Sequence, residues 1–513
     1  MSMINKAPCE GSAPCTSPNP EQTKNGLWIL AATILGSSMA FIDGTVVNVA
    51  LPALQTALHA SVSGIQWVVE SYALLLASLL LLGGSMGDLY GRRRMFLFGV
   101  GVFALASTWC GLAQSMTSLI VARGVQGVGA AFLVPGSLAL ISASFAAEER
   151  GRAIGTWSGF TAITASVGPV LGGWLVQHLS WRWVFFINLP LAVVVVLVTL
   201  WRVPESRNAN EGRHLDWQGA VLATVGLGAI TFGLIEEHGG GVVVWACFVG
   251  GLVALAGFLM VEAHSPEPMV SLRLFRSRDF SGANLLTFLL YGAINGILFF
   301  FPLDLIQVQG YSATQAGAAL LPLILLVFVL SRWAGGLVVR YGARMPLTIG
   351  PMVVALGFVL FLRPGIGGSY WTTFFPAVVS LGVGMAISVA PLTTAVMESV
   401  SVDEAGMASG INNAVSRMAG LLAIAVFGLV LASGFNRALD RSLARMQVSP
   451  AVRENVDRHR SQLAGGQTSD SRIRQAIDDA FLSGYRDVIW LSVGLSLLSA
   501  ASARMIGSNA STH

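Results

Sequence analysis

Fourteen stretches of this sequence are each long and apolar enough to cross a lipid bilayer. A spanning helix needs about 20 mostly apolar residues to cross roughly 30 Å of hydrocarbon. The pattern therefore predicts an all-α integral membrane protein. The predicted spans cover residues 27–49, 61–82, 95–113, 117–142, 153–175, 183–201, 217–235, 243–261, 281–306, 313–338, 345–363, 371–397, 407–432 and 485–506.

The composition indicates the same class. Hydrophobic residues make up 54% of the chain and charged residues 11%, whereas a soluble domain carries about 25% charged residues. Most of the chain is therefore expected to lie in lipid or against other helices. The net charge of +4 does not indicate a nucleic-acid partner, because the arginines are spread over loop ends, as in cytoplasmic loops of membrane proteins.

The arginines also predict an orientation. They follow the even-numbered spans, at Arg92, Arg93, Arg94, Arg150, Arg152, Arg202, Arg207, Arg213, Arg273, Arg276, Arg278, Arg340 and Arg344. The opposite loops hold few cations, such as Arg182 and Arg363. Both termini are therefore expected in the cytoplasm and the spans in the cell inner (plasma) membrane. Acidic residues after the twelfth span, Glu398, Asp403 and Glu404, count little in this rule.

Two similar strings predict an internal repeat. The string GSMGDLYGRRRM (Gly84–Met95) follows the second span, and GGLVVRYGAR (Gly335–Arg344) follows the tenth. Parallel repeats are a known transporter plan, with the substrate site between the halves. We therefore expect a cytoplasmic disordered tail at 1–26, a six-helix half at 27–202, a linker with two extra helices at 203–280, a second half at 281–506, and a short cytoplasmic tail at 507–513.

The segment 433–484 is the one long loop, and it is expected outside the cell. Leu439, Leu443 and Met446 recur at helical spacing, as do Ile473, Ile477 and Phe481. The segment is consistent with one or two amphipathic helices packed on the outer face or at the lipid interface. It is also consistent with a gate for substrate or partner, and the pattern does not separate the two.

Five strings together resemble one family. Besides Gly84–Met95, they are FIDGTVVNVALP (Phe41–Pro52), SLIVARGVQGVGAA (Ser118–Ala131), SVGPVLGG (Ser166–Gly173) and WRWVFFINLP (Trp181–Pro190). In order, they resemble the fourteen-helix drug:proton antiporter family of the major facilitator superfamily, over nearly all of residues 27–506. The resemblance implies the major facilitator fold, with two six-helix halves and two inserted central helices, and proton-driven export without a cofactor.

The first string predicts a conformational latch. Gly84 and Gly87 would let backbones approach closely. Asp88 would pair with Arg92 or meet another helix N-terminus, whose dipole favours an anion. In the family that the chain resembles, this cluster, which includes Gly91, latches the cytoplasmic side in the outward-open state. A solvated loop of ordinary charges is the alternative.

The string at Ser166–Gly173 predicts a bent, closely packed helix. Pro169 removes a helical hydrogen bond and kinks the span, while Gly168, Gly172 and Gly173 permit tight packing. Such a helix suits a hinge or seal, and the resemblance implies export rather than uptake. A kink that faces lipid is the alternative.

Ionisable residues inside spans are the main functional candidates, because a charge at mid-bilayer costs at least about 2.5–3.5 kcal/mol. Asp43 lies in the first span, and Glu70 lies about 14 Å into the second. Arg123 lies in the fourth span with Gln126 three residues on. Two more are Asp304, near the end of the ninth span, and Arg417, inside the thirteenth.

The resemblance implies that Asp43 and Arg123 bind protons and cationic substrate, since both fall in the family strings. The proposed roles of Glu70 and Asp304 rest on burial alone. Structural readings remain open, because Asp43 could cap or pair within the fold and Arg123 could simply neutralise a carboxylate. Glu236 and Glu237 are expected to form a solvated turn.

The sequence gives little support for an enzymatic function. The string GVQGVGAA falls inside a span with no preceding strand, which argues against a dinucleotide loop. The sequence contains no GxxxxGKS/T string for ATP. Cys9 and Cys15 lie in the tail and Cys110 and Cys247 in spans, so no disulfide framework is indicated. No metal site is expected.

The residues and the resemblance together predict a secondary active exporter. It would exchange protons for drugs or other lipophilic, cationic organic compounds, with Asp43 as coupling group and Glu70 assisting. Burial favours a neutral carboxyl group and a nearby cation favours the anion, so a change in access can load and release a proton. A dedicated exporter of one metabolite or antibiotic, and a non-transporting receptor or scaffold, are the alternatives. A periplasmic adaptor and an outer-membrane channel are possible partners.

Overall fold

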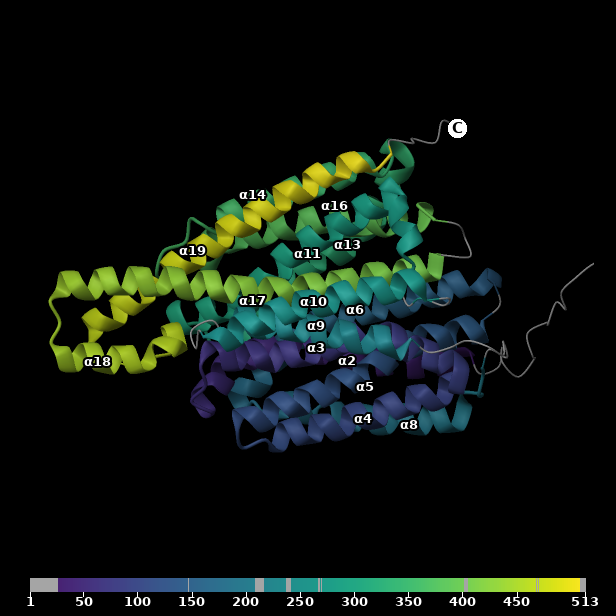
Figure 1. The fold of residues 1–513 in the computed structure, drawn as a ribbon, viewed down its shortest axis with the longest axis horizontal. Coiled ribbons are helices and arrows are strands. Elements are labelled where there is room, and N and C mark those ends of the chain that lie inside the picture. The colour runs from purple at the N-terminus through teal and green to yellow at the C-terminus, as the bar shows by residue number, and fades with distance from the viewer. Residues whose placement is uncertain are drawn as a thin grey trace, which may run out of the picture.

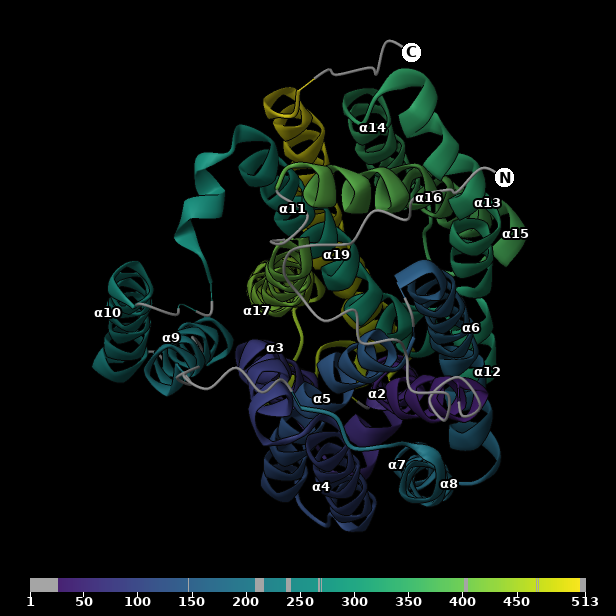
Figure 2. The ribbon, with the colours of Figure 1, turned by 90° about the vertical axis from the view of Figure 1, so that its right-hand side faces the viewer.

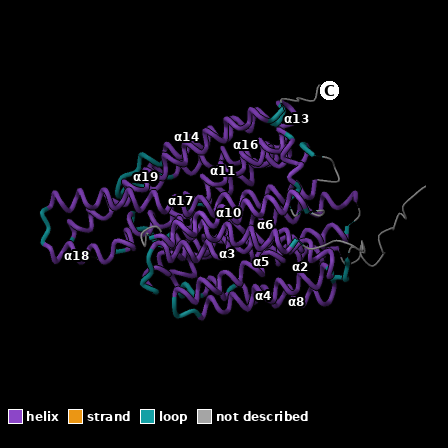
Figure 3. The backbone as a smooth tube through the Cα atoms, viewed as in Figure 1, coloured by secondary structure: helices purple, strands orange, loops and turns teal. Residues whose placement is uncertain are grey.

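The computed structural model describes residues 26–145, 147–207, 216–236, 241–265, 268, 270–400, 405–466, 468 and 470–507. These residues form helices and connecting loops without strands (Figures 1 and 3). Thirteen helices are long and apolar enough to cross a membrane, and Arg344–Leu360 is a shorter apolar helix. The predicted all-α membrane fold is confirmed. Cys9, Cys15, Arg213, Glu237, Asp403 and Glu404 lie outside the described residues, as does nearly all of both predicted tails.

The first half contains six spans. Its helices are α2 (Gly26–Ala57), α3 (Val62–Tyr90), α4 (Arg92–Leu112), α5 (Met116–Ser144), α6 (Ala147–His178), α7 (Trp183–Phe186) and α8 (Asn188–Arg202). The predicted sixth span is thus made of α7 and α8. Glycine brings α3 and α5 into backbone contact, because a Cβ on Gly127 would lie 2.5 Å from the carbonyl oxygen of Tyr72. This contact places Tyr72 beside the inward face of α5.

The second half contains five helices long enough to span a membrane and the shorter apolar helix Arg344–Leu360. Its helices are α11 (Arg278–Leu303) with the π-helix η3 (Asp304–Val308), α12 (Ala313–Ala318), α13 (Leu321–Tyr341), α14 (Arg344–Leu360), α15 (Tyr370–Thr373), α16 (Phe375–Glu398), α17 (Ala405–Met446) and α19 (Ser471–Ser502) with η6 (Ala503–Met505). The predicted tenth span is built from α12 and α13, and the predicted twelfth from α15 and α16.

Two helices stand between the halves in sequence and beside them in space. These are α9 (Trp217–Ile235) and α10 (Val242–His264), and η2 (Leu272–Arg276) leads on to α11. Viewed along the bundle, α10 lies outermost and α9 lies between α10 and the pair α3 and α17 (Figure 2). In the most apolar 18-residue stretch of α10, only 6% of the residues are buried. Lipid is therefore its main environment. This arrangement matches the predicted inserted pair.

The segment between α17 and α19 is helical rather than a loop. We call α18 (Pro450–His459), η5 (Arg460–Gly465) and the adjoining ends of α17 and α19 the hairpin. α17 continues to Met446 and α19 begins at Ser471, so both helices extend beyond the predicted span limits at 432 and 485. The helical spacing is confirmed, because Leu439, Leu443, Ile473, Ile477 and Phe481 are buried, whereas Met446 at the end of α17 is exposed.

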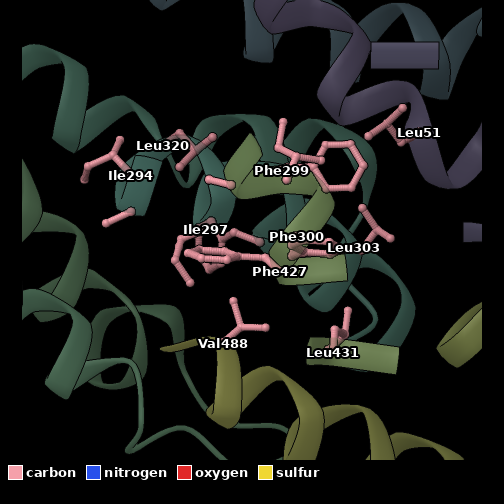
Figure 4. Packing of buried hydrophobic residues seen from close by; sticks show 14 of the residues in the cluster. Leu51, Ile294, Ile297, Phe299, Phe300, Leu303, Leu320, Phe427, Leu431 and Val488 are labelled. Carbon is pink, nitrogen blue, oxygen red and sulfur yellow. The ribbon is translucent and has the colours of Figure 1, made fainter. Parts of the chain in front are cut away.

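The two ends of the bundle differ in packing. We call the end that carries the hairpin the hairpin end, and the end where α2 begins and α19 finishes the tail end (Figure 1). Toward the hairpin end, residues of the first half such as Leu51 join the second half's Phe299 and Leu303 in one hydrophobic cluster (Figure 4). Toward the tail end, the first half has a separate cluster of its own, around Phe96 and Phe103. The halves are therefore joined most firmly at the hairpin end.

Candidate functional site

A buried ion pair lies in the centre of the first half. Asp43 is on α2 and Arg123 on α5, and their side chains are 0% and 1% exposed. Nη1 of Arg123 lies 2.5 Å from Oδ2 of Asp43. The same guanidinium donates through Nε to the carbonyl oxygen of Val68 at 3.0 Å. Two buried charges need such close pairing, because either one alone would carry a large desolvation cost.

Three further polar side chains complete the network around Asp43. Gln126 donates from Nε2 to Oδ1 of Asp43 at 2.9 Å, and its Oε1 accepts from Arg123 at 2.7 Å. Asn188 on α8 donates to the same Oδ1 at 3.3 Å. Asn188 and Gln126 both donate to Oγ of Ser107 on α4. The structure thus brings together three of the predicted site residues, Asp43, Arg123 and Gln126, in a cluster that draws on four helices.

Sequence reasoning missed Asn188 and Ser107. Asn188 lies inside the string Trp181–Pro190, so its place in that string was the available signal. Ser107 had no signal beyond a hydroxyl in an apolar span. Oγ of Ser107 donates to the carbonyl oxygen of Phe185, 2.8 Å away, which ties α4 to α7.

Aromatic rings close the cluster around Arg123. The guanidinium carbon lies 4.3 Å from the ring centroid of Tyr72 and 5.8 Å from that of Phe185. Such cation–π contacts are strongest where water is excluded. Oη of Tyr72 donates to the carbonyl oxygen of Ala40 at 3.3 Å. The Asp43–Arg123 pair is therefore held in a buried site that aromatic rings line on the side of the guanidinium.

Glu70 is in the opposite situation. It is 0% exposed on α3, and neither carboxyl oxygen has a hydrogen-bond partner among the described residues. Among the described residues, Glu70 forms no ion pair within 4.0 Å. On the same helix face, Gln66 contacts α17. Leu74 packs where α9 and α17 meet, a boundary that we call the seam. The structure therefore places Glu70 apart from Asp43, at the seam between the two halves.

Asp304 lies toward the hairpin end of the second half. It opens η3, two residues after Pro302, and is 1% exposed. Among the described residues its carboxyl group has one weak hydrogen bond, which Nε2 of Gln309 donates to Oδ1 at 3.5 Å. A π-helical turn of this kind is frequent at functional sites. Asp304 does not join either Asp43 or Glu70.

Arg417 is half-buried on α17, within electrostatic range of Tyr72 across the boundary between the halves. Its Nε has no hydrogen-bond partner among the described residues. Five residues before Arg417, Asn412 donates to Oδ1 of Asn284 at 3.1 Å and to Oγ1 of Thr287 at 2.7 Å. These bonds fix α17 against α11 and leave Arg417 facing the first half.

The predicted latch residues lie at the tail end. Nε of Arg92 donates to Oδ1 of Asp88 at 2.9 Å, so the predicted pair forms. Gly91 has φ +111°, and a Cβ there would lie 2.8 Å from Oε1 of Glu205. Glu205, which sequence reasoning missed, accepts from the backbone N–H of Arg93 at 3.1 Å. The segment after α8 therefore holds the α3–α4 turn.

The predicted close approach at Gly84 and Gly87 is absent from this conformation. A Cβ on Gly84 would meet only the Pro135 side chain at an ordinary 3.5 Å, and no described atom lies within 4 Å of one on Gly87. The second half does not press on this surface, since the halves join mainly at the hairpin end. Gly87 is itself buried and Gly84 partly buried, so in this state the two glycines leave room for a side chain without meeting a neighbouring backbone.

The glycines of the Ser166–Gly173 string are packed between two helices. A Cβ on Gly172 would lie 2.9 Å from the carbonyl oxygen of Val46 on α2. Gly173 faces the backbone of Ala313 on α12, and Gly317 on α12 faces the carbonyl oxygen of Pro169. The close packing is confirmed and the lipid-facing alternative is wrong. α6 joins the two halves here without a side chain between the backbones.

The described residues offer no obvious metal site, since they contain no group of three or more His, Cys, Asp or Glu side chains arranged to hold an ion. Cys110 packs inside the Asp43 network, with Sγ 3.6 Å from Oε1 of Gln126. Polar chemistry at membrane depth is thus carried by carboxyl, guanidinium, amide and hydroxyl groups.

Sequence comparison assigns the chain to a family. Residues 33–424 match the model described as Major Facilitator Superfamily. The chain is 38% identical over 444 residues to the multidrug resistance protein Stp of Mycobacterium tuberculosis (strain CDC 1551 / Oshkosh), across 84% of this chain and 80% of that protein. It is 32% identical over 412 residues to the tetracenomycin C resistance and export protein of Streptomyces glaucescens, across 79% of this chain and 76% of that protein.

Solved structures share the fold at low sequence identity. A bacterial homologue of the human lysosomal transporter Spinster, inward-facing and occupied, matches with TM-score 0.66 and 16% identity, across 96% of this chain and 97% of that one. A D-xylose–proton symporter matches with TM-score 0.60 and 13% identity, across 94% and 98%. The chain therefore belongs to the major facilitator superfamily, as a multi-pass membrane transporter rather than an enzyme.

Proposed function

We propose that this protein exports lipophilic, cationic organic compounds from the cytoplasm across the plasma membrane in exchange for protons. Relatives named for multidrug resistance support the substrate class. The observation that carries the coupling is the contrast between two buried carboxyl groups, because Asp43 is fully paired and Glu70 has no partner among the described residues. A paired carboxylate is stable as an anion, whereas an unpaired buried one is far less costly when protonated.

Asp43 is proposed as the coupling group within the first half. A proton on Asp43 would leave the buried guanidinium of Arg123 without its counter-charge. That state is costly, so the network of Gln126 and Asn188 would have to rearrange. Because this network ties together α2, α4, α5 and α8, one proton can change the packing of the whole half.

Glu70 is proposed to carry the exchanged proton and to attract cationic substrate. In this state its neutral form suits a seam without counter-charge. Arg417 is proposed to repel cations from the second half's side and to keep proton and cation from binding together. Asp304 is proposed as a further proton-binding group near the hairpin end, in support of Glu70.

The energy available is sufficient for export. One charge moved through 100 mV is worth about 2.3 kcal/mol. At 1.36 kcal/mol per decade, this supports a gradient of roughly fifty-fold for each net charge that moves inward, as when two protons exchange for one monovalent cation. An exchange of one proton for one monovalent cation moves no net charge, so the pH difference alone drives it. No cofactor is required, since the proton gradient supplies the energy. A periplasmic adaptor and an outer-membrane channel are not needed for exchange across one membrane, and they do not enter the proposal.

We further propose that the tail end faces the cytoplasm. The arginines that follow even-numbered spans support this orientation. Packing of the halves at the hairpin end then corresponds to a state closed to the outside. The Asp88–Arg92 pair, Gly84 and Gly87 would form the latch when the tail end closes.

The test is a pH-gradient assay in inside-out vesicles energised by respiration, with a panel of lipophilic cations, neutral drugs and anions. Proton release triggered by several cations, lost in Asp43→Asn and in Glu70→Gln, is the expected result. Glu454→Gln serves as control, because that carboxylate is exposed on α18. Export by Asp43→Asn at the wild-type rate overturns the coupling assignment.

A dedicated exporter of one antibiotic or metabolite is the second candidate. It is favoured by relatives that are named for single compounds, such as the cephamycin export protein of Amycolatopsis lactamdurans and the puromycin resistance protein of Streptomyces alboniger. Silence across the whole panel with well-inserted protein selects this candidate. A non-transporting receptor that binds partners through the hairpin is distinguished by hairpin deletion, which would remove partner capture but not transport.

A further inference from the structure

A pocket of about 300 Å³ opens at the hairpin end beside the inserted helix α9. Ser63 and Gln66 of α3, Ile235 and Glu236 at the end of α9, and Gly428 of α17 contribute to its walls, and the hairpin covers it. This pocket is separate from the Asp43 cluster. Its walls come from α3, α9 and α17 and carry both polar and apolar side chains.

Gln66 forms the inner end of this pocket. Its Nε2 donates to the carbonyl oxygen of Ile424 at 2.9 Å, across the boundary between the halves. Its side-chain amide occupies the space that a Cβ on Gly428 would need. Glu70 is four residues further along α3, so it lies on the same helix face, about 6 Å deeper. The unpartnered carboxyl group is therefore one helical turn beneath the pocket.

The register of α9 against α3 can be read from two contacts. A Cβ on Gly228 would lie 3.2 Å from Cδ2 of Leu74. One turn along, the ring of Phe232 lies 6.3 Å from the ring of Trp67. The two helices run in opposite directions, and Glu70 lies between Leu74 and Trp67. The residues of α9 at that level are Ile230 and Thr231, and Ile230 faces α10, because a Cβ on Gly251 would lie 2.8 Å from Cγ1 of Ile230.

Thr231 is oriented toward the same seam. It lies four residues after Leu227, which packs with Leu74 and Leu421, and four residues before Ile235, which lines the pocket. Residues four apart share a helix face. Thr231 is 0% exposed, and its Oγ1 has no hydrogen-bond partner among the described residues. A hydroxyl and a carboxyl group, both buried and both unpartnered, thus lie at one level of one seam.

Buried polar groups nearly always have a hydrogen-bond partner, and water is the usual one where protein supplies none. The charged and titratable groups on the elements packed against α3 are Asp43, Arg92, Arg93, Arg94, Cys110, Arg123, Arg417, Arg437, Asp440, Arg441, Arg445 and Arg460. Glu236 and Asp457 line the pocket itself. Asp43 and Arg123 neutralise each other, Arg460 pairs with Asp457, and Glu236 accepts from Nε1 of Trp67. None of them is placed to satisfy both Glu70 and Thr231.

We propose that α3, α9 and α17 enclose a water-filled path by which protons reach Glu70 from the hairpin end, with Thr231 as the residue that positions water beside the carboxyl group. This inference rests on the proposed function for the role of Glu70. The water chain gives a proton to the carboxylate, where an O–H bond forms, and regains one from bulk water in the pocket. The inserted pair thereby gains a function, since α9 is a wall of the path and α10 shields α9 from lipid.

The first test compares three variants in proteoliposomes with ethidium as the transported probe. Thr231→Val removes the hydroxyl and keeps the shape, and is expected to slow proton–ethidium exchange about tenfold. Its rate should rise with acidity on the hairpin side over a pH range where the wild type is flat. Thr231→Ser should restore the rate. Thr224→Val is the matched control, because its Oγ1 already donates to the carbonyl oxygen of Ala220 at 2.7 Å on the same helix.

The second test blocks the path without touching its inner residues. Ser63→Cys, in a protein whose four native cysteines are replaced, is labelled with a bulky membrane-impermeant maleimide. Labelling should abolish proton flux and leave ethidium binding, measured by fluorescence anisotropy, unchanged. Ser369→Cys, on an exposed loop of the second half, is the labelling control.

The outcomes separate the path from the proposed function. If Glu70→Gln exchanges protons normally, the proposed role of Glu70 is wrong. If Glu70→Gln loses exchange but Thr231→Val and labelled Ser63→Cys behave as wild type, the path is wrong and the proposed function stands. Loss in all three, with activity in both controls, supports the path.

Discussion

Gln55 of the first half and Gln307 of the second meet at the hairpin end, with Nε2 of Gln307 2.7 Å from Oε1 of Gln55. Both also hold the hairpin. Nε2 of Gln55 donates to the carbonyl oxygen of Gln462 at 3.0 Å, and the carbonyl oxygen of Gln307 accepts from Nη2 of Arg474 at 2.5 Å. The hairpin therefore closes over a junction that already links the two halves.

Removing this junction should favour opening at the hairpin end. Gln307→Ala loses one amide contact between the halves, worth about 1 kcal/mol, which is roughly a five-fold shift in a two-state equilibrium. Spin labels at Ala57 and Ser369, both exposed and on different halves, should report a larger population of long distances. Gln114→Ala, an exposed glutamine within the first half, should leave the distribution unchanged. An unchanged distribution in Gln307→Ala as well would show that the junction does not hold the halves.

The Asp43–Arg123 pair yields a second prediction. Asp43→Asn keeps the shape but leaves a buried guanidinium without its counter-charge, which costs about 3–5 kcal/mol. The variant should still insert, and it should unfold at a lower temperature in detergent. Arg123→Gln alone should cost a similar amount, whereas the double variant should regain much of the loss, because no unpaired charge remains. Additive losses in the double variant would mean that the two residues do not act as a pair.

The sequence predicts that several charged side chains are buried, but it does not predict which of them form ion pairs. Asp43, Glu70 and Asp304 all appear as acids inside apolar spans. Which one meets an arginine depends on how α2 and α5 pack, and that packing is set by glycine contacts such as Gly127 on Tyr72. Sequence spacing within one helix carries no information about it. For this reason the sequence shows both Asp43 and Glu70 as acids inside spans, and only the structure shows that Asp43 is paired with Arg123 while Glu70 has no partner among the described residues.

The hairpin shows the reverse case. Leu439 and Ile473 repeat at helical spacing, and the structure confirms helices there. The helix extends beyond the predicted span limit because polar residues such as Arg437 and Asp440 end an apolar stretch without ending a helix. Asp440 instead pairs with Arg460 across the hairpin. Hydropathy thus located the spans, while helix continuity was decided by packing and ion pairs outside them.

A third prediction concerns the α6–α12 contact. Gly173→Val would place two methyl groups into the backbone of Ala313, and neither helix can move without separating the halves. We expect the protein to insert but to lose transport, because closure at the hairpin end is blocked. Gly335→Val on α13 is the control, since no described atom lies within 4 Å of a Cβ there. The vesicle assay with ethidium reads both variants, and active transport by Gly173→Val would show that this contact is not part of the cycle.

A fourth prediction concerns the α3–α4 turn. Gly91 has φ +111°, a conformation that costs other residues of order 1–3 kcal/mol, and its missing side chain makes room for Glu205. Gly91→Ala should therefore displace the Glu205 side chain and break its hydrogen bond from the backbone N–H of Arg93. Glu205→Gln is the matched variant, because it keeps the space and loses only the charge that faces Arg94 at 3.7 Å. Limited proteolysis between α8 and α9 should be faster in Gly91→Ala and nearly unchanged in Glu205→Gln. Equal protection in both would mean that the turn is held by the Asp88–Arg92 pair rather than by the segment that follows α8.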